Sequence, residues 1–205
     1  MDVPSQILSS ATRLFARRGY DGTSLSAIAE SVGIRKASLL YHFPSKEDLR
    51  RAVLDQLIQH WNEVLPRLLG AVTSGRGRFE ALTRELVAFF QADSDRARLL
   101  VRELMDRPEE MRARLAQGVR PWVDLLSDYV RRGQEGGEIL PDVDAEAYVV
   151  HVITLTVCGI AALPVVTALM PEGTSRTSIE ARHVDELLRI AAASLFSTAD
   201  TVEAR

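Results

Sequence analysis

Features of secreted and disulfide-stabilised proteins are scarce in this 205-residue chain. Its single cysteine, Cys158, cannot form a disulfide within the chain, so the sequence needs no oxidising compartment. The first twenty residues contain no unbroken apolar stretch of signal-peptide length, and their basic cluster follows the apolar positions instead of preceding them. We therefore expect a cytoplasmic globular protein, consistent with 46% hydrophobic and 26% charged residues.

Lysine is also scarce, and charge is unevenly distributed along the chain. The only two lysines, Lys36 and Lys46, lie in the first 52 residues, which carry eight basic and five acidic side chains and a formal charge of +3. The other 153 residues carry 17 basic and 23 acidic side chains, a formal charge of −6. A basic N-terminal quarter on an acidic body indicates that one end of the protein contacts a polyanion.

Strand-like alternation is almost absent, whereas apolar residues recur at helical spacing throughout the chain. The pattern predicts an all-α fold of about nine helices. Gly33 and Pro44 are expected to end the second and third helices, and Pro121 is expected to break or kink the seventh. The expected helical segments are residues 7–18, 25–32, 34–43, 46–65, 79–90, 95–105, 108–132, 145–170 and 178–197.

Residues 147–170 contain no charged side chain, a length that could span a bilayer, and residues 149–157 are rich in β-branched side chains that favour strands. Acidic flanks, His151 and Pro164 argue against a membrane span, and the length of the segment argues against a strand. We expect this segment to be a helix at the subunit interface of a homodimer. An arginine at Ile160 is then expected to dissociate or unfold the protein.

Two short helices separated by Gly33 follow a supporting helix and precede a helix capped by Ser45. This arrangement predicts a helix-turn-helix DNA-binding domain over residues 1–48. The second short helix is expected to pack through Leu39 and Phe43. Its polar side chains off that face can then reach a groove of double-stranded DNA. They are Arg35, Lys36, Ser38 and Tyr41.

The same region carries three motifs over about fifty contiguous residues: Phe15-Ala16-x-x-Gly19-Tyr20-x-Gly22-Thr23-Ser24, Ile28-Ala29-x-x-x-Gly33-Ile34 and Leu39-x-x-His42-Phe43-Pro44-Ser45-Lys46-Glu47-x-Leu49. They resemble the N-terminal domain of TetR-type transcriptional regulators. The resemblance implies phosphate contacts from Thr23 or Ser24, His42 and Lys46. Two positions depart from the family pattern: Arg35 replaces the usual Ser or Thr, and Leu40 replaces a common tyrosine. The candidate DNA-binding residues are Thr23, Ser24, Arg35, Lys36, Ser38, Leu40, Tyr41, His42 and Lys46.

The resemblance also implies that residues 49–205 form a ligand-binding and dimerisation domain. The expected protein is a ligand-responsive regulator, most often a repressor, that binds an inverted-repeat operator as a homodimer and is released by a small, largely apolar or aromatic effector. No cofactor, metal or membrane partner is expected. The candidate ligand-binding residues are Trp61, Leu65, Leu86, Phe89, Phe90, Leu104, Met105, Trp122, Leu126, Tyr129, His151, Thr154 and Cys158.

Two other classes of function remain open at this stage. Glu180 and His183 have the Glu-x-x-His spacing of helical di-iron enzymes, but such sites use two copies and further carboxylates, and the chain has one copy. We therefore do not expect an enzyme. The alternative to a small-molecule sensor is a helical DNA-binding adaptor whose C-terminal domain binds a protein partner.

Overall fold

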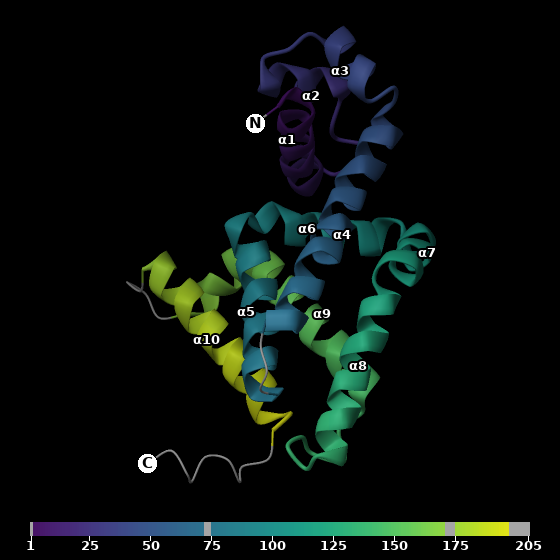
Figure 1. The fold of residues 1–205 in the computed structure, drawn as a ribbon. Helices are drawn as coiled ribbons and strands as arrows, with labels where there is room; N and C mark the ends of the chain where they lie inside the picture. The colour runs from purple at the N-terminus through teal and green to yellow at the C-terminus, as the bar shows by residue number, and fades with distance from the viewer. Residues whose placement is uncertain (1, 72–74, 171–174, 197–205) are drawn as a thin grey trace.

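The computed structural model describes residues 2–71, 75–170 and 175–196, and within these ranges it contains ten α-helices, one 3-10 turn and no strand (Figure 1). An isolated β-bridge joins Ile139 to Phe196. The all-α prediction is confirmed. The helices are α1 (Val3–Arg18), α2 (Leu25–Val32), α3 (Lys36–His42), α4 (Lys46–Ala71), α5 (Gly75–Ala92), α6 (Ser94–Asp106), α7 (Pro108–Gly118), α8 (Arg120–Glu135), α9 (Ala145–Val166) and α10 (Arg176–Ala193), with the 3-10 turn η1 at Thr167–Leu169.

Helices α1–α3 form a small N-terminal head at one end of the molecule (Figure 1). Phe15, Ile28 and Leu39, one from each helix, are fully buried and share one apolar cluster. Gly33 ends α2 with φ 78° and ψ 26°, a left-handed conformation that disfavours residues with a Cβ. The expected glycine turn between the two short helices is therefore confirmed.

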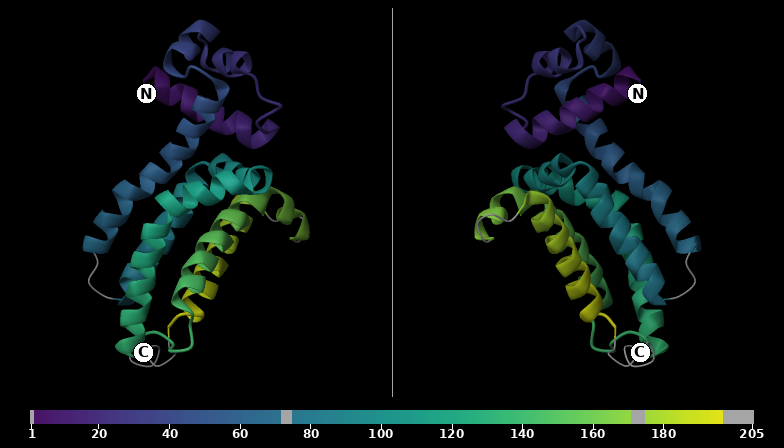
Figure 2. Two further views of the ribbon diagram at one scale, coloured as in Figure 1. Left: turned by 90° about the vertical axis from the view of Figure 1, so that its right-hand side faces the viewer. Right: turned by 90° about the vertical axis from the view of Figure 1, so that its left-hand side faces the viewer.

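The long helix α4 leads from this head into the body of the molecule (Figure 2). Its start is capped as the sequence predicts, because the backbone N–H of Asp48 donates to Ser45 Oγ at 3.0 Å. Ser45 Oγ in turn donates to Asp48 Oδ2 at 2.7 Å. The cap fixes where α4 begins, immediately after α3, and so sets the position of the helix-turn-helix relative to the body.

The predicted break at Pro121 is a complete separation into two helices. Helix α7 ends at Gly118 and α8 begins at Arg120, so that Pro121 lies in the first turn of α8, where its missing N–H costs no intrahelical hydrogen bond. This separation accounts for the ten helices in the described ranges where about nine were predicted.

Helix α6 crosses the molecule between the head and the body. It packs against α1 on the head side and against α9 on the body side, and α9 also contacts α5, α8 and α10. Side views show α4, α5 and α8 on one side of the body and α9 and α10 on the other (Figure 2). The head therefore meets the body through α6 and through the first turns of α4.

Helix α9 with η1, Ala145–Leu169, is long and apolar enough to cross a membrane by length and composition alone, but here it packs against four helices of the body. Ile160 belongs to the core of the monomer and is almost fully buried. Of the two outcomes expected for an arginine at Ile160, this burial favours unfolding of the chain over dissociation of a dimer.

Candidate functional site

Helix α3 lies at the outer end of the head (Figure 1). Its exposed side chains are largely polar and basic. Leu39 anchors the opposite side of the helix in the core, so the remaining side chains are directed outward. Tyr41 is 85% exposed, and its ring lies edge-on to His42 at 5.2 Å between centroids. Leu40 is half-buried. The exposed residues of this face are Arg35, Lys36, Ala37, Ser38, Tyr41 and His42.

The two hydroxyl residues before α2 differ in their surroundings. Ser24 is exposed and caps α2, because its side chain accepts a hydrogen bond from Ala27 N. Thr23 is only 2% exposed, and its hydroxyl lies within hydrogen-bonding distance of the carbonyl oxygens of Leu14 and Gly19. The structure therefore corrects the expectation for Thr23: its side chain is directed into the head and holds the α1–α2 connection.

Lys46 begins α4 beside the α3 surface. Its ammonium nitrogen lies 4.1 Å from the centroid of the Tyr20 ring, a cation–π contact that keeps the charge near the head. The Arg107 guanidinium lies 4.4 Å from the same ring centroid. Lys46 is half-buried, and this contact holds its ammonium group over the Tyr20 ring.

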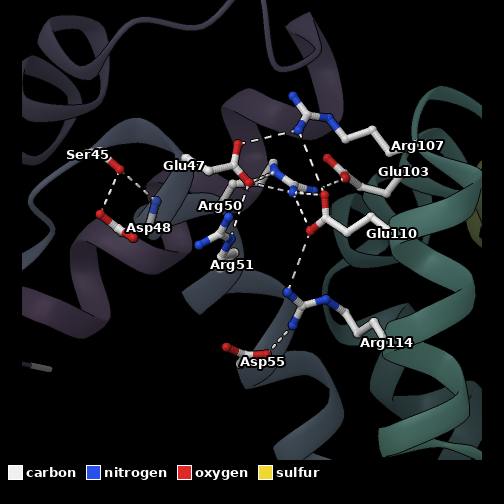
Figure 3. A network of polar contacts seen from close by, with 10 residues as sticks. All are labelled: Ser45, Glu47, Asp48, Arg50, Arg51, Asp55, Glu103, Arg107, Glu110 and Arg114. Atoms are coloured by element: carbon white, nitrogen blue, oxygen red, sulfur yellow. Dashed lines mark hydrogen bonds and ion pairs between the residues drawn. The ribbon is translucent and has the colours of Figure 1, made fainter.

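A buried network of charges joins the first turns of α4, which follow the head, to α6 and α7 (Figure 3). Its centre is Arg50, whose side chain is fully buried. Arg50 donates to Glu47 on its own helix at 2.6 Å, to Glu103 on α6 and to Glu110 on α7. Arg107 extends the network with contacts of 3.4 Å to Glu47 and 3.9 Å to Glu110.

The pKa values of the acidic partners shift in opposite directions. Hydrogen bonds from Arg50 lower the pKa of Glu47, which is partly exposed. Burial raises the pKa of Glu103, and the Arg50 charge opposes that rise. For Arg50 itself, burial disfavours the charged form, but the hydrogen bonds to Glu47 and Glu110 outweigh it and raise the pKa. The Arg50 charge therefore limits the rise in the pKa of Glu103 that burial causes.

The body contains an apolar cavity of about 200 Å³ that is partly open to the surface. Its wall comes from every helix of the body from α4 to α9, with Leu195 after α10, and it is rich in aromatic rings. Eight of the predicted ligand-binding residues lie in this wall: Trp61, Leu65, Leu86, Phe89, Phe90, Trp122, Leu126 and Tyr129.

The other five predicted ligand-binding residues are not among those that line this cavity. On α6, Leu104 is partly exposed and Met105 is 78% exposed, whereas Leu100 is the α6 residue in the wall. On α9 the wall is formed by positions 148, 149, 152, 153 and 157. The helical period carries His151, Thr154 and Cys158 to the exposed side of α9. The structure thus corrects the expectation for these five residues.

The exposed side of α9 is an uncharged stripe, and we call it the α9 face. It includes the large apolar side chains Val150, Leu155 and Val165, with Ile190 exposed on the neighbouring α10. The remaining members of the α9 face are His151, Thr154, Cys158 and Ala162. Uncharged stripes of this length are unusual on the surface of a monomer.

Helix α10 packs closely on α9 where Gly159 faces His183. A Cβ built on Gly159 would lie 2.8 Å from His183 Nε2, so a larger residue there would require the His183 ring to move. In the part of the chain that the structure describes, no group of three or more His, Cys, Asp or Glu side chains could hold a metal ion.

Sequence reasoning missed the two arginines that matter most for the site. Arg50 lies on the buried row of α4 with Val53, Leu54 and Leu57, and a charged residue in an apolar row is a signal that it has buried partners. Arg114 lies in the cavity wall and also pairs with Asp55. No local pattern in α7 distinguishes Arg114 from the exposed Arg112.

Comparisons with known proteins find relatives for both parts of the chain. Residues 7–53 match the family described as bacterial regulatory proteins, tetR family, and residues 98–170 match the tetracyclin repressor-like C-terminal domain. The chain is 29% identical over 136 residues to the HTH-type transcriptional regulator LmrA of Bacillus subtilis (strain 168), covering 64% of this chain and 72% of LmrA.

A second relative is the biofilm operon icaADBC HTH-type negative transcriptional regulator IcaR of Staphylococcus aureus (strain Newman). It is 31% identical over 134 residues, covering 65% of this chain and 70% of IcaR. The fold is similar to that of the ketosteroid transcriptional regulator KstR2 of Mycobacterium tuberculosis, with a TM-score of 0.75, 17% identity and 96% of each chain covered.

Proposed function

The chain belongs to the TetR family of bacterial transcriptional regulators, and we propose that it is a repressor that binds an inverted-repeat operator as a homodimer and is released by a small apolar effector. The observation that carries the proposal is the pairing of two features in one chain. An exposed basic helix lies at one end, and an aromatic cavity of about 200 Å³ lies in the body. A protein that acts on chromosomal DNA works in the cytoplasm.

The α3 surface supports sequence reading in a major groove. A recognition helix needs a buried anchor and several exposed donors on the opposite side, and α3 has both in Leu39 and in Arg35, Lys36 and Tyr41. Arg35 precedes the helix and makes no capping hydrogen bond with its side chain. Its guanidinium is therefore available to form a bidentate contact with a guanine.

The α9 face supports a homodimer. Two copies of α9 and α10 packed across a twofold axis would cover Val150, Leu155 and Ile190, which a monomer leaves in water. A twofold dimer places two α3 helices on one side of the DNA, and its operator is then an inverted repeat.

The Arg50 network supports a coupling between effector and DNA. Helices α6 and α7 carry cavity-wall residues, including Leu100 and Met111, and also carry Glu103 and Glu110, which bind Arg50. An effector that binds more tightly when α6 and α7 have moved would shift the first turn of α4, and with it the head. The loss of DNA-binding free energy cannot exceed the difference between the effector's binding free energies for the two arrangements.

The assignment of base and phosphate contacts predicts two classes of mutant. We expect Arg35→Ala or Lys36→Ala to cost about 1–3 kcal/mol per good base contact and to relax the preference at particular base pairs. Lys46→Ala should weaken binding to all sequences alike and reduce the salt dependence by about two units in a dimer. Fluorescence anisotropy with operator and scrambled duplexes at several salt concentrations measures both effects.

The exposed Arg112 on α7, far along the chain from the head, provides the matched control, because Arg112→Ala should change neither affinity nor salt dependence. If Arg35→Ala and Lys36→Ala lowered the affinity for operator and scrambled DNA equally, these residues would contact phosphates and not bases. Equal affinity of the unaltered protein for all sequences would favour the adaptor with a protein partner.

A further inference from the structure

Arg114 belongs to both the cavity wall and the charge network of the body. Its side chain is 15% exposed, Nη1 donates to Asp55, and Nη2 lies 3.8 Å from Glu110 Oε1 (Figure 3). The third guanidinium nitrogen, Nε, is buried, and its N–H has no hydrogen-bond partner in the ranges that the structure describes. Burying an N–H of a charged group without a hydrogen-bond acceptor costs free energy. The position of Arg114 Nε therefore indicates a place where an acceptor could bind.

The other polar groups of the wall are largely occupied within the protein. Trp122 Nε1 donates to Asn62 Oδ1 at 2.7 Å, and Thr83 Oγ1 donates to the Phe79 carbonyl oxygen at 2.9 Å. The hydroxyl groups of Tyr129 and Tyr148 donate to backbone carbonyl oxygens of residues 75 and 191. Three buried side-chain nitrogens in the described ranges lack a partner, and Arg114 Nε is the one that belongs to a cavity-lining residue.

The charge around Arg114 decides which kind of acceptor fits. A guanidinium only donates hydrogen bonds, so the ligand must present an oxygen or nitrogen lone pair. The Arg114 charge is already balanced by Asp55 and approached by Glu110. A carboxylate in the cavity would lose its hydration and lie in the field of both acids. A neutral carbonyl oxygen loses much less hydration energy than a carboxylate and carries no net charge for the two acids to repel.

We propose that the effector is an uncharged molecule with an aromatic or aliphatic body and one carbonyl-type acceptor, which receives a hydrogen bond from Arg114 Nε. The inference rests on the proposed function, because it names the ligand class of the same cavity. A dry apolar cavity of about 150 Å³ is large enough for benzene. This cavity, at about 200 Å³, takes one ring with a short substituent.

Three probes of one size separate the parts of the proposal. Butyrophenone carries a carbonyl group next to the ring, butylbenzene lacks it, and 4-phenylbutanoate carries a carboxylate at the far end of a chain of similar length. The chain has two tryptophans, Trp61 and Trp122, and both line the cavity, so titration of their fluorescence reports binding directly. We expect butyrophenone to bind at least about tenfold more tightly than 4-phenylbutanoate.

Two variants remove the donor. Arg114→Met should weaken butyrophenone binding about tenfold and change butylbenzene binding less than about twofold. Arg114→Lys keeps a positive charge for Asp55 but has no Nε donor, and it should show the same selective loss if Arg114→Met fails to fold. Arg112→Met, with the same substitution on the exposed side of α7, should leave all three affinities unchanged.

The outcomes distinguish the inference from the function on which it rests. Equal losses for butyrophenone and butylbenzene in the Arg114 variants would overturn the role of Nε, while still showing that the cavity binds ligands. Tighter binding of 4-phenylbutanoate than of butyrophenone would overturn the neutral acceptor. Failure of all three probes to bind the unaltered protein would contradict the apolar sensor itself.

Discussion

Replacing Arg50 with methionine is expected to lower the free energy of unfolding by about 3–5 kcal/mol. The reason is that Glu103, with a side chain only 4% exposed, loses its charged partner and remains in the interior, while Glu47 and Glu110 lose their shared donor. Denaturant titration followed by circular dichroism measures the change. Arg51→Met is the matched control, because Arg51 is exposed and its 3.5 Å pair with Glu47 is worth less than about 1 kcal/mol.

The loss of unfolding free energy caused by Arg50→Met should be smaller at about pH 5 than at about pH 8. Without Arg50, the pKa of Glu103, already raised by burial, rises further. A carboxyl group whose pKa is raised by folding stabilises the fold below its unfolded pKa, and that contribution is lost as pH rises through the folded pKa. The unaltered protein also loses the stabilisation from Glu47, whose pKa is lowered, as pH falls.

A second substitution separates the charge effect from loss of packing. Glu103→Gln in the Arg50→Met background removes the unpaired charge, and we expect it to recover about 1–3 kcal/mol and to weaken the pH dependence. If the double variant is no more stable than Arg50→Met at neutral pH, the network does not hold the head on the body by charge pairing.

Leu155→Arg is expected to convert the dimer to a monomer and to weaken operator binding at least about a hundredfold. Leu155 is 45% exposed on the α9 face, so the arginine is tolerated in one chain but would be buried without a partner between two copies. Linking two DNA-binding heads multiplies their joint affinity by about 10²–10⁴, and that factor is lost with the dimer. Analytical ultracentrifugation and anisotropy with an operator duplex measure the two losses.

Leu125→Arg controls for adding a charge to a partly exposed leucine. Leu125 is 39% exposed on α8, away from the α9 face, so this variant should remain dimeric and bind DNA normally. A monomeric unaltered protein at micromolar concentration, or a dimeric Leu155→Arg variant, would show that the α9 face is not the interface.

Local signals were sufficient to predict the head. Gly33, Pro44 and Ser45 each act within a few residues, through backbone conformation or capping, so the end of α2, the end of α3 to within one residue and the start of α4 follow from the sequence. The choice between Thr23 and Ser24 was different. Both can cap a helix, and which of them turns inward depends on the packing of α1 against α2.

The body was predicted less completely, because its decisive contacts join distant parts of the chain. A pattern of apolar residues identifies a helix but does not fix which side faces a cavity, and so His151, Thr154 and Cys158 were placed on the wrong side of α9. The pairing of Arg50 with Glu103 spans 53 residues, and no local spacing indicates it.

Selection of binding sites from a random pool of DNA duplexes tests the central claim most directly, because the selection itself reveals the operator sequence. The account predicts enrichment of an inverted repeat whose two half-sites are read by α3 of each subunit, with a marked loss of enrichment for Arg35→Ala. The absence of any enriched sequence, or enrichment of a single half-site without twofold symmetry, would contradict a homodimeric sequence-specific regulator.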